Sequence, residues 1–124
     1  MNIIIDRPQL VRAVLLYLTK SFGNLTPKEI KKYPDSLFYV NSENEVLMEY
    51  DKKTKVIWID YDNIWSKLER YFYLEYNDIQ LIMKDWLEET YKLGGVTPKA
   101  VRWFDYRWLE ETYKLGGVTL DFND

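Results

Sequence analysis

Residues 37–60 decide the architecture of this chain, and they read LFYVNSENEVLMEYDKKTKVIWID. Three short runs rich in aromatic and β-branched residues lie at 37–40, 46–50 and 55–60. A polar segment, such as residues 41–44, separates each run from the next. Short apolar runs joined by polar turn residues are typical of consecutive β-hairpins. The stretch therefore predicts a three-stranded antiparallel meander.

The sequence before the meander has the period of a helix. Apolar residues recur at i, i+3 and i+4 over residues 7–22, starting at Val11, and this spacing predicts one amphipathic helix. Residues 26–29, Thr-Pro-Lys-Glu, have the pattern of a capping box, in which the first and fourth side chains satisfy the first backbone N–H groups of a helix. We therefore expect a second, short helical turn that ends before Pro34.

The helical period returns three times after Asp60. Apolar stripes lie over residues 64–72 and 79–87, and a third helix is expected to start at Thr97-Pro98 and to continue through Trp108. Glycine pairs follow the second and third stripes, where they are typical of helix ends. The expected fold class is α+β, with an N-terminal helix, a three-stranded antiparallel meander and then three C-terminal helices.

A perfect internal repeat lies in the last third of the chain. The twelve residues Trp86–Thr97 recur without a change as Trp108–Thr119, 22 positions later. A solenoid needs at least three repeats, so two identical copies indicate a duplication rather than a repeat fold. We expect a single α+β domain over 1–97 and a duplicated helical appendage over 98–124, which packs on the body or on a partner. Exchange of equivalent elements between two chains would give a homodimer.

One of these regions also resembles known sequences. The stretch 74–98 contains Leu-Glu-Tyr at its start, Trp-Leu-Glu-Glu from Trp86 and Gly-Gly-Val-Thr-Pro at its end. It resembles the C-terminal stretch of small uncharacterised proteins of large DNA viruses and environmental phages. The resemblance covers about a fifth of the chain and implies a viral or phage-like origin, hence the cytoplasm of a host cell, but no mechanism.

Two residue types are missing from the composition. The chain has 124 residues with no Cys and no His, so disulfides, thiolate metal sites and imidazole catalysis are excluded. We expect no cofactor, no metal site and no enzymatic activity. The lack of Cys fits a reducing cytoplasm. No apolar run approaches the ~20 residues of a membrane helix, and the first six residues do not form a secretory signal, so a soluble protein without membrane contact is expected.

The charge is divided unevenly along the chain. The net charge is −3, yet residues 1–34 carry six Lys and Arg against two Asp and Glu, a balance of +4. The candidate anion-facing residues are Arg7, Arg12, Lys28, Lys31 and Lys32. Basic surfaces can bind the phosphates of nucleic acids, so a nucleic-acid-binding module that uses residues 1–34 is the alternative function. The acidic balance of the remaining chain disfavours it, and a solvated helical face explains the cations equally simply.

Asp60 and Asp62 form the only motif with an enzymatic precedent. They follow an apolar run, and the sequence Asp-Tyr-Asp-Asn resembles the first motif of haloacid-dehalogenase-type phosphatases. The resemblance implies a nucleophilic Asp60, an acid–base Asp62 and a Mg²⁺ ion, which makes a phosphoryl-transfer enzyme the third hypothesis. Against it, Ile64 stands where that family has Thr or Val. The competing interpretation is that Asp60 or Asp62 caps the helix that follows.

Aromatic residues make up 17% of the chain, and this excess has the clearest functional implication. Packing in the core is the first explanation of these rings and a protein interface the second, since Tyr and Trp bury a large area and keep a polar tip. The candidate interface residues are Tyr39, Tyr50, Trp58, Trp86, Trp108 and Tyr113. Acidic residues surround these rings where a nucleic-acid-binding sheet would carry Arg and Lys. The leading hypothesis is a small non-enzymatic protein that binds another protein or itself.

Overall fold

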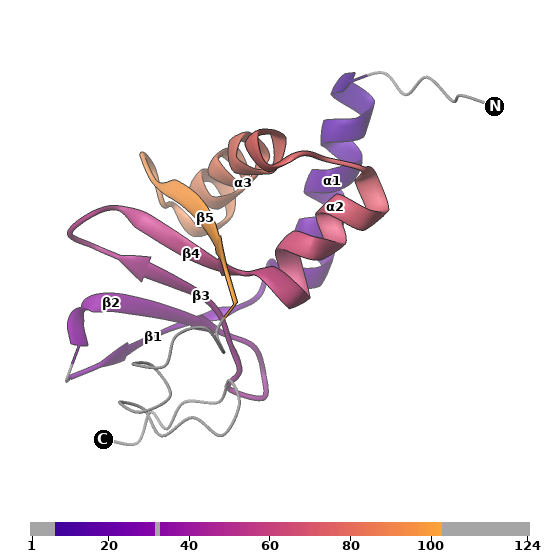
Figure 1. Cartoon of the computed structure of the whole chain (residues 1–124). Coiled ribbons are helices and arrows are strands. Elements are labelled where there is room, and N and C mark those ends of the chain that lie inside the picture. Colours follow the sequence, from indigo (N-terminus) through magenta and orange to yellow (C-terminus); the bar gives the residue numbers. More distant parts are fainter. Residues whose placement is uncertain (1–6, 32, 103–124) are drawn as a thin grey trace.

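The computed structural model describes residues 7–31 and 33–102 of the chain. A five-stranded sheet forms one side of the described molecule, and the helices gather on the other (Figure 1). The fold class is α+β, as predicted. In chain order the elements are α1 Arg7–Phe22, β1 Thr26–Ile30, β2 Tyr33–Val40, β3 Val46–Asp51, β4 Val56–Asp60, the π-helix η1 Tyr61–Trp65, α2 Ser66–Phe72, α3 Tyr76–Tyr91 and β5 Thr97–Val101.

The sheet follows the chain order from β1 to β5. The first four strands pair antiparallel with their neighbours, whereas β5 pairs parallel to β4. The chain from β4 to β5 therefore crosses over through η1, α2 and α3. The predicted meander corresponds to β2, β3 and β4, but three strands are too few, because one further strand lies on each side of them.

The core lies between the helices and one face of the sheet. Side chains alternate between the two faces of each strand, and those of one set pack against the helices. The sheet contributes Tyr39, Met48, Ile57 and Ile59, and the helices contribute Val14, Leu18, Trp65, Leu68, Ile79, Met83 and Leu87. Within the described residues α1, α2 and α3 all pack against this one face of the sheet, so the opposite face carries no described helix.

Helical periodicity located most of the helices. The predicted helix over 7–22 is α1, and the two stripes after Asp60 are η1 with α2 and then α3. Each of these segments has an apolar stripe long enough to cover the sheet, so local preference and tertiary packing agree. Within 7–31 and 33–102, no helix combines the length and the hydropathy needed to cross a membrane.

The predicted helical turn at 26–29 is wrong, because Thr26–Ile30 is the edge strand β1. The capping-box pattern is a local signal, and pairing with β2 over five residues outweighs it. Pro27 has no N–H group to donate, and an edge strand is where a sheet tolerates proline. The same residues that look like a helix start therefore also suit the rim of a sheet.

The predicted third C-terminal helix is also wrong at its start, because Thr97–Val101 is strand β5. Pro98 again stands second in the strand. The outer edge of β5 is covered by α3: Gln80 Nε2 donates to the Pro98 carbonyl at 2.8 Å, and the Ala100 N–H donates to the Tyr76 hydroxyl at 3.1 Å. The sheet thus extends past the expected domain boundary at residue 97, and the rest of that predicted helix lies outside the described residues.

The hydroxyl group of Tyr91 on α3 forms two hydrogen bonds with the backbone at the junction between α1 and β1. Tyr91 Oη donates to the carbonyl of Phe22, at the end of α1, and accepts from the N–H of Leu25, just before β1, at 3.0 Å. Its ring packs edge-on against Tyr39 and Trp86, with centroids 4.9 and 5.5 Å away. Trp86 Nε1 donates to Thr19 Oγ1 of α1 at 3.1 Å. The first copy of the repeat is therefore bonded to α1 by two side chains.

We expect Tyr91→Phe to lower the free energy of unfolding by about 1–3 kcal/mol, because two backbone groups at the α1–β1 junction lose their partner. A urea melt measures it. Tyr73→Phe is the matched control, since Tyr73 is 90% exposed, and it should change stability by less than about 0.5 kcal/mol. Equal stabilities for the two variants would show that the hydrogen bonds of the Tyr91 hydroxyl do not stabilise the α1–β1 junction.

Candidate functional site

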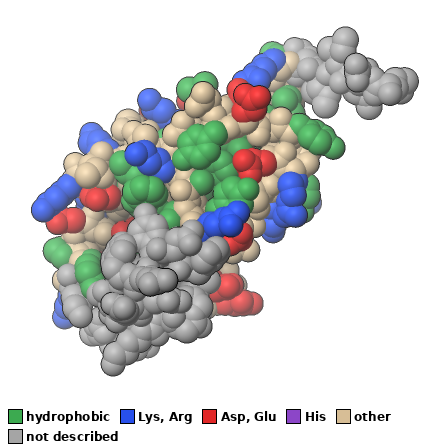
Figure 2. All heavy atoms as spheres, in the orientation of Figure 1, with side chains coloured by type: hydrophobic (Ala, Val, Ile, Leu, Met, Phe, Trp, Pro, Cys, Tyr) green, Lys and Arg blue, Asp and Glu red, His purple; other side chains and the backbone are tan. Residues whose placement is uncertain are grey.

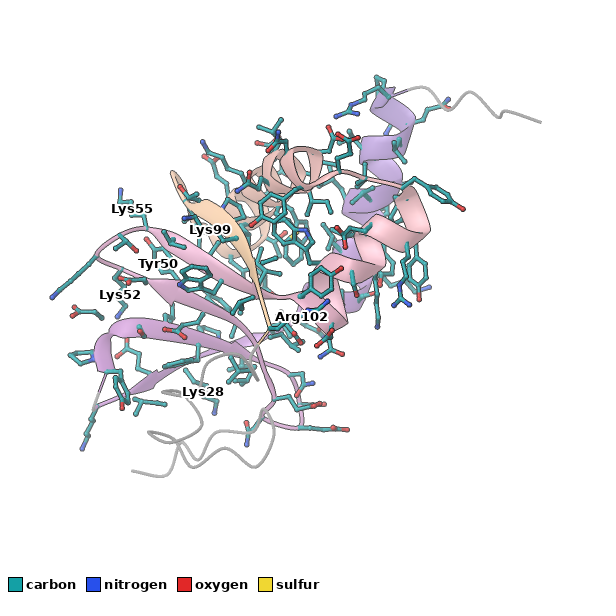
Figure 3. All side chains as sticks on the ribbon, in the orientation of Figure 1. Lys28, Tyr50, Lys52, Lys55, Lys99 and Arg102 are labelled. Carbon is teal, nitrogen blue, oxygen red and sulfur yellow. The ribbon has the colours of Figure 1, made fainter. Side chains whose placement is uncertain are left out.

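A pocket opens where β4 ends, next to the end of its parallel neighbour β5. Its lining residues are Tyr61, Asp62, Ser66, Glu69 and Arg70, and its volume is about 460 Å³. The carboxyl ends of parallel strands are where α/β sheets usually hold ligands. Arg102, directly after β5, extends over the same region, with its guanidinium 4.5 Å from the centroid of the Tyr61 ring (Figure 3).

Asp60, the last residue of β4, is buried and acts as a helix cap. One of its carboxylate oxygens accepts from the Asp62 N–H at 3.2 Å, and the other accepts from the Asn63 side-chain amide. Burial raises the pKa of Asp60, and the hydrogen bonds from Asn63 and Asp62 oppose that rise. Both oxygens are thus engaged at the start of η1. The structure shows the capping role that the sequence offered as the competing interpretation of this motif.

The charged residues that line the pocket are two acids, Asp62 and Glu69, and one base, Arg70. The Tyr61 hydroxyl donates to Glu69 Oε1 at 2.8 Å, and the Ser66 hydroxyl donates to the Asp62 carbonyl at 3.0 Å. Asp62 itself is exposed. Among the described residues no cluster of three or more acidic side chains is placed to hold a metal ion. The Glu69 carboxylate thus holds the Tyr61 hydroxyl in place at this pocket.

The helix-free face of the sheet carries a second arrangement that crosses all five strands. The register pairs Lys28 with Phe38, Phe38 with Glu49, Glu49 with Trp58, and Trp58 with Lys99. These five residues therefore form one transverse row in which two cations flank two aromatic rings and a central carboxylate. Lys99 Nζ lies 5.8 Å from the centroid of the Trp58 ring, within the range of a cation–π contact.

Glu49, at the centre of this row, is a buried acid with incomplete hydrogen bonding. Its side chain is 6% exposed, and Oε2 accepts from the Ser36 hydroxyl at 3.1 Å, whereas buried Oε1 has no hydrogen-bond partner. Burial raises the pKa of Glu49, the Ser36 hydrogen bond opposes the rise, and Asp51 adds to it. An unpaired buried oxygen costs free energy, so this carboxyl group is held in place by the fold around it.

Sequence reasoning missed this row, although a signal for it exists. Both edge strands begin with the same tripeptide, Thr-Pro-Lys, at 26–28 and 97–99. In each strand the proline faces the helices and the lysine faces the helix-free side. The repeated tripeptide marks the two rims of one sheet, which becomes apparent only once the strands are in register.

The predicted interface residues fall into three groups. Tyr39 and Trp86 are buried in the helix-side core, so they pack inside this chain. Tyr50 is half-buried and packs against the helix-side core, and Trp58 is half-buried on the opposite face of the sheet. The last two, Trp108 and Tyr113, lie outside the described residues.

The predicted anion-facing residues do not form one described surface. Arg7 begins α1 and pairs with Asp78 at 2.6 Å, and Arg12 is exposed on the same helix. Lys28 and Lys31 belong to β1 and its end, at the rim of the sheet far from the start of α1 (Figure 1). Lys32 lies outside the described residues. Cations elsewhere on the sheet, including Lys52 and Lys55, are also spread out (Figure 3).

Tyr71 and Tyr73 are exposed at the end of α2, on the helical side of the molecule, and Tyr71 contacts Tyr17 of α1. We call Leu16, Tyr17, Tyr71 and Tyr73 the tyrosine corner. The Tyr17 ring lies 6.0 Å from that of Tyr71, and Tyr71 and Tyr73 are 58% and 90% exposed. Leu16, on the solvent side of α1, is also largely exposed. Hydrophobic side chains reach the surface across the helical half of the molecule (Figure 2).

Comparison with known proteins adds no assignment to these sites. No family model, curated protein or solved structure matches the chain.

Replacing the cap tests the role of Asp60. We expect Asp60→Ala to lower the free energy of unfolding by about 0.5–2 kcal/mol, because η1 loses the acceptor at its first turn. Asp62→Ala, the matched control at an exposed position, should cost less than about 0.5 kcal/mol. Thermal melts measure both variants. Clear hydrolysis of a generic phosphomonoester with Mg²⁺ by the parent chain, lost in a folded Asp60→Ala variant, would contradict a purely structural role.

Burial of Glu49 makes stability depend on pH. Because the folded state holds the proton of Glu49 more tightly than the unfolded state does, stability falls as pH rises from the ordinary pKa of a glutamate to the raised one. We expect Glu49→Gln to be more stable than the parent at pH 7 and to lose that advantage at pH 4. Urea melts across this range measure the difference. Exposed Glu43→Gln is the control, and a parallel profile for both variants would contradict the prediction.

Proposed function

We propose that this chain is a non-enzymatic protein-binding protein, an accessory of viral or phage type in the cytoplasm of a host cell, and that the tyrosine corner is its contact surface. The proposal rests above all on Tyr73. This residue ends α2 in the left-handed conformation, with φ 55° and ψ 39°, and its ring is 90% exposed.

Tyr73 does little for the fold that contains it. A left-handed conformation costs a residue with a side chain about 1–2 kcal/mol, and glycine usually occupies this place at a helix end. The exposed ring recovers almost none of that cost through packing within the described chain. A conformational cost with no return in stability is typical of residues that serve contact with another molecule.

The chemistry of the tyrosine corner also suits a protein partner. Tyrosine rings supply a large contact area at low entropic cost, and they are among the residues that dominate binding energy at interfaces. Tyr17 packs edge-on against Tyr71 and against Phe72, at 6.0 and 5.7 Å between ring centroids, so the exposed Tyr71 ring stands on packed aromatic neighbours.

Substitution of Tyr73 separates binding from stability. We expect Tyr73→Gly to keep or raise the free energy of unfolding, within about 1 kcal/mol, because glycine adopts the left-handed conformation without strain. The same change should weaken capture of a partner protein about tenfold or more, as loss of a central interface tyrosine does. Affinity capture from the native host, quantified by mass spectrometry, measures the binding.

Leu81→Ala is the matched control, because Leu81 is 64% exposed on α3, away from the corner, and should leave capture unchanged. Equal recovery of all proteins by the parent, Tyr73→Gly and Leu81→Ala would contradict the proposal. Recovery of nucleic acid with a steep loss of affinity as salt rises would support the nucleic-acid alternative instead.

A further inference from the structure

The outer side of α1 carries a leucine and a cation that the described chain leaves uncovered. Leu16 is 67% exposed, whereas the buried residues of this helix, Val14, Leu18 and Phe22, face the core. Arg12 lies four residues before Leu16, so the two side chains project from the same side of the helix. Arg12 is exposed as well, and within the described residues no ion pair includes it.

A hollow with an acidic lining lies between α1 and α3. Its volume is about 550 Å³, and its lining residues are Leu15 of α1 and Asp85, Glu88, Glu89 and Lys92 of α3 and its C-cap. Three carboxylates against one ammonium group give this lining a balance of −2. The carboxylates are exposed, and the ion pairs of the described residues include none of them. The hollow is therefore suited to a cation from another molecule.

We propose that a second copy of this chain binds here, through two α1 helices that pack antiparallel around a two-fold axis near Leu16. In a two-fold interface the same patch of both copies is self-complementary, so every contact occurs twice. The two Leu16 side chains meet near the axis, and Arg12 of each copy enters the acidic hollow of the other. One patch of α1 and α3 thus supplies both the cation and the site that receives it.

The position of the hollow along α1 follows from two contacts between α1 and α3. Arg7, at the start of α1, pairs with Asp78, near the start of α3, at 2.6 Å. Further along both helices, Trp86 Nε1 donates to Thr19 Oγ1 at 3.1 Å. The two helices therefore run in the same direction. Glu88 follows Trp86 on α3, so the acidic hollow lies beside the second half of α1.

An antiparallel pair of α1 helices brings the opposite charges together. Arg12 lies one turn, about 6 Å, before Leu16 in the first half of α1. When the second α1 runs in the opposite direction, its Arg12 lies one turn beyond the axis, level with the second half of the first α1 and its hollow. A parallel pair would place the two Arg12 side chains next to each other, where like charges repel. The charges therefore select the antiparallel arrangement.

Sedimentation velocity of the full chain over a concentration series up to ~1 mM tests this dimer. We expect the parent to dimerise, and Arg12→Glu to weaken the dimer about tenfold or more, because it places like charges together twice in one interface. Lys55→Glu, an exposed charge reversal next to β4, is the matched control and should leave the dimer unchanged. A parent chain that stays monomeric throughout the series, or equal dimers for the two variants, would overturn the inference.

Mixing two reversed chains tests the pairing itself. A double variant, Glu88→Lys with Glu89→Lys, should also fail to dimerise alone. An equimolar mixture with Arg12→Glu should recover a dimer of one chain of each kind, since one contact is then the original pair and the other is that pair with its charges exchanged. All these positions are exposed, so the chains should stay folded, which thermal melts check. A mixture that remains monomeric would overturn the inference.

This dimer goes beyond the proposed function, although its surface shares Leu16 with the tyrosine corner. It depends on the charges of α1 and α3 and not on Tyr73. We therefore expect Tyr73→Gly to dimerise like the parent, so that loss of partner capture and loss of the dimer are observed separately. A Tyr73→Gly chain that no longer dimerises would place the contact between copies at the tyrosine corner and overturn the inference.

Discussion

The parallel pairing of β5 with β4 is the constraint on which the rest of this structure depends. Parallel neighbours cannot be joined by a tight turn, so the chain must cross over between them, and here η1, α2 and α3 make the crossing. They lie on the same side of the sheet as α1, and that side becomes the core. The pocket at the end of β4 and the helix-free face both follow from this arrangement.

Asp60 and Glu49 are both buried carboxyl groups, but their hydrogen bonding differs. Asp60 ends β4, and backbone and amide donors from the start of the crossing meet both of its oxygens. Glu49 stands in the middle of the helix-free face, and only one of its oxygens is met by a described residue. The crossover thus satisfies both oxygens of Asp60, whereas one buried oxygen of Glu49 has no described partner.

Sequence periodicity located α1, the three central strands and the helices of the crossover, because in each of them the local pattern agrees with the packing. It failed at 26–30 and 97–101, where Thr-Pro-Lys has the local pattern of a helix start and pairing with a distant strand decides otherwise. The motif at Asp60 was found, and its capping role was one of two interpretations. Glu49 and Tyr73 could not be found from the sequence, since register and a left-handed helix end depend on the folded chain.

The parallel pairing of β5 with β4 is what brings the described helices onto one face of the sheet. The most direct measurement is a set of NMR nuclear Overhauser effects between backbone protons of the two strands, at Trp58 with Lys99 and at Ile59 with Ala100. We predict these cross-strand contacts within one chain in a dilute sample. Sequential contacts typical of a helix over residues 97–101, without contacts to β4, would contradict the parallel pairing.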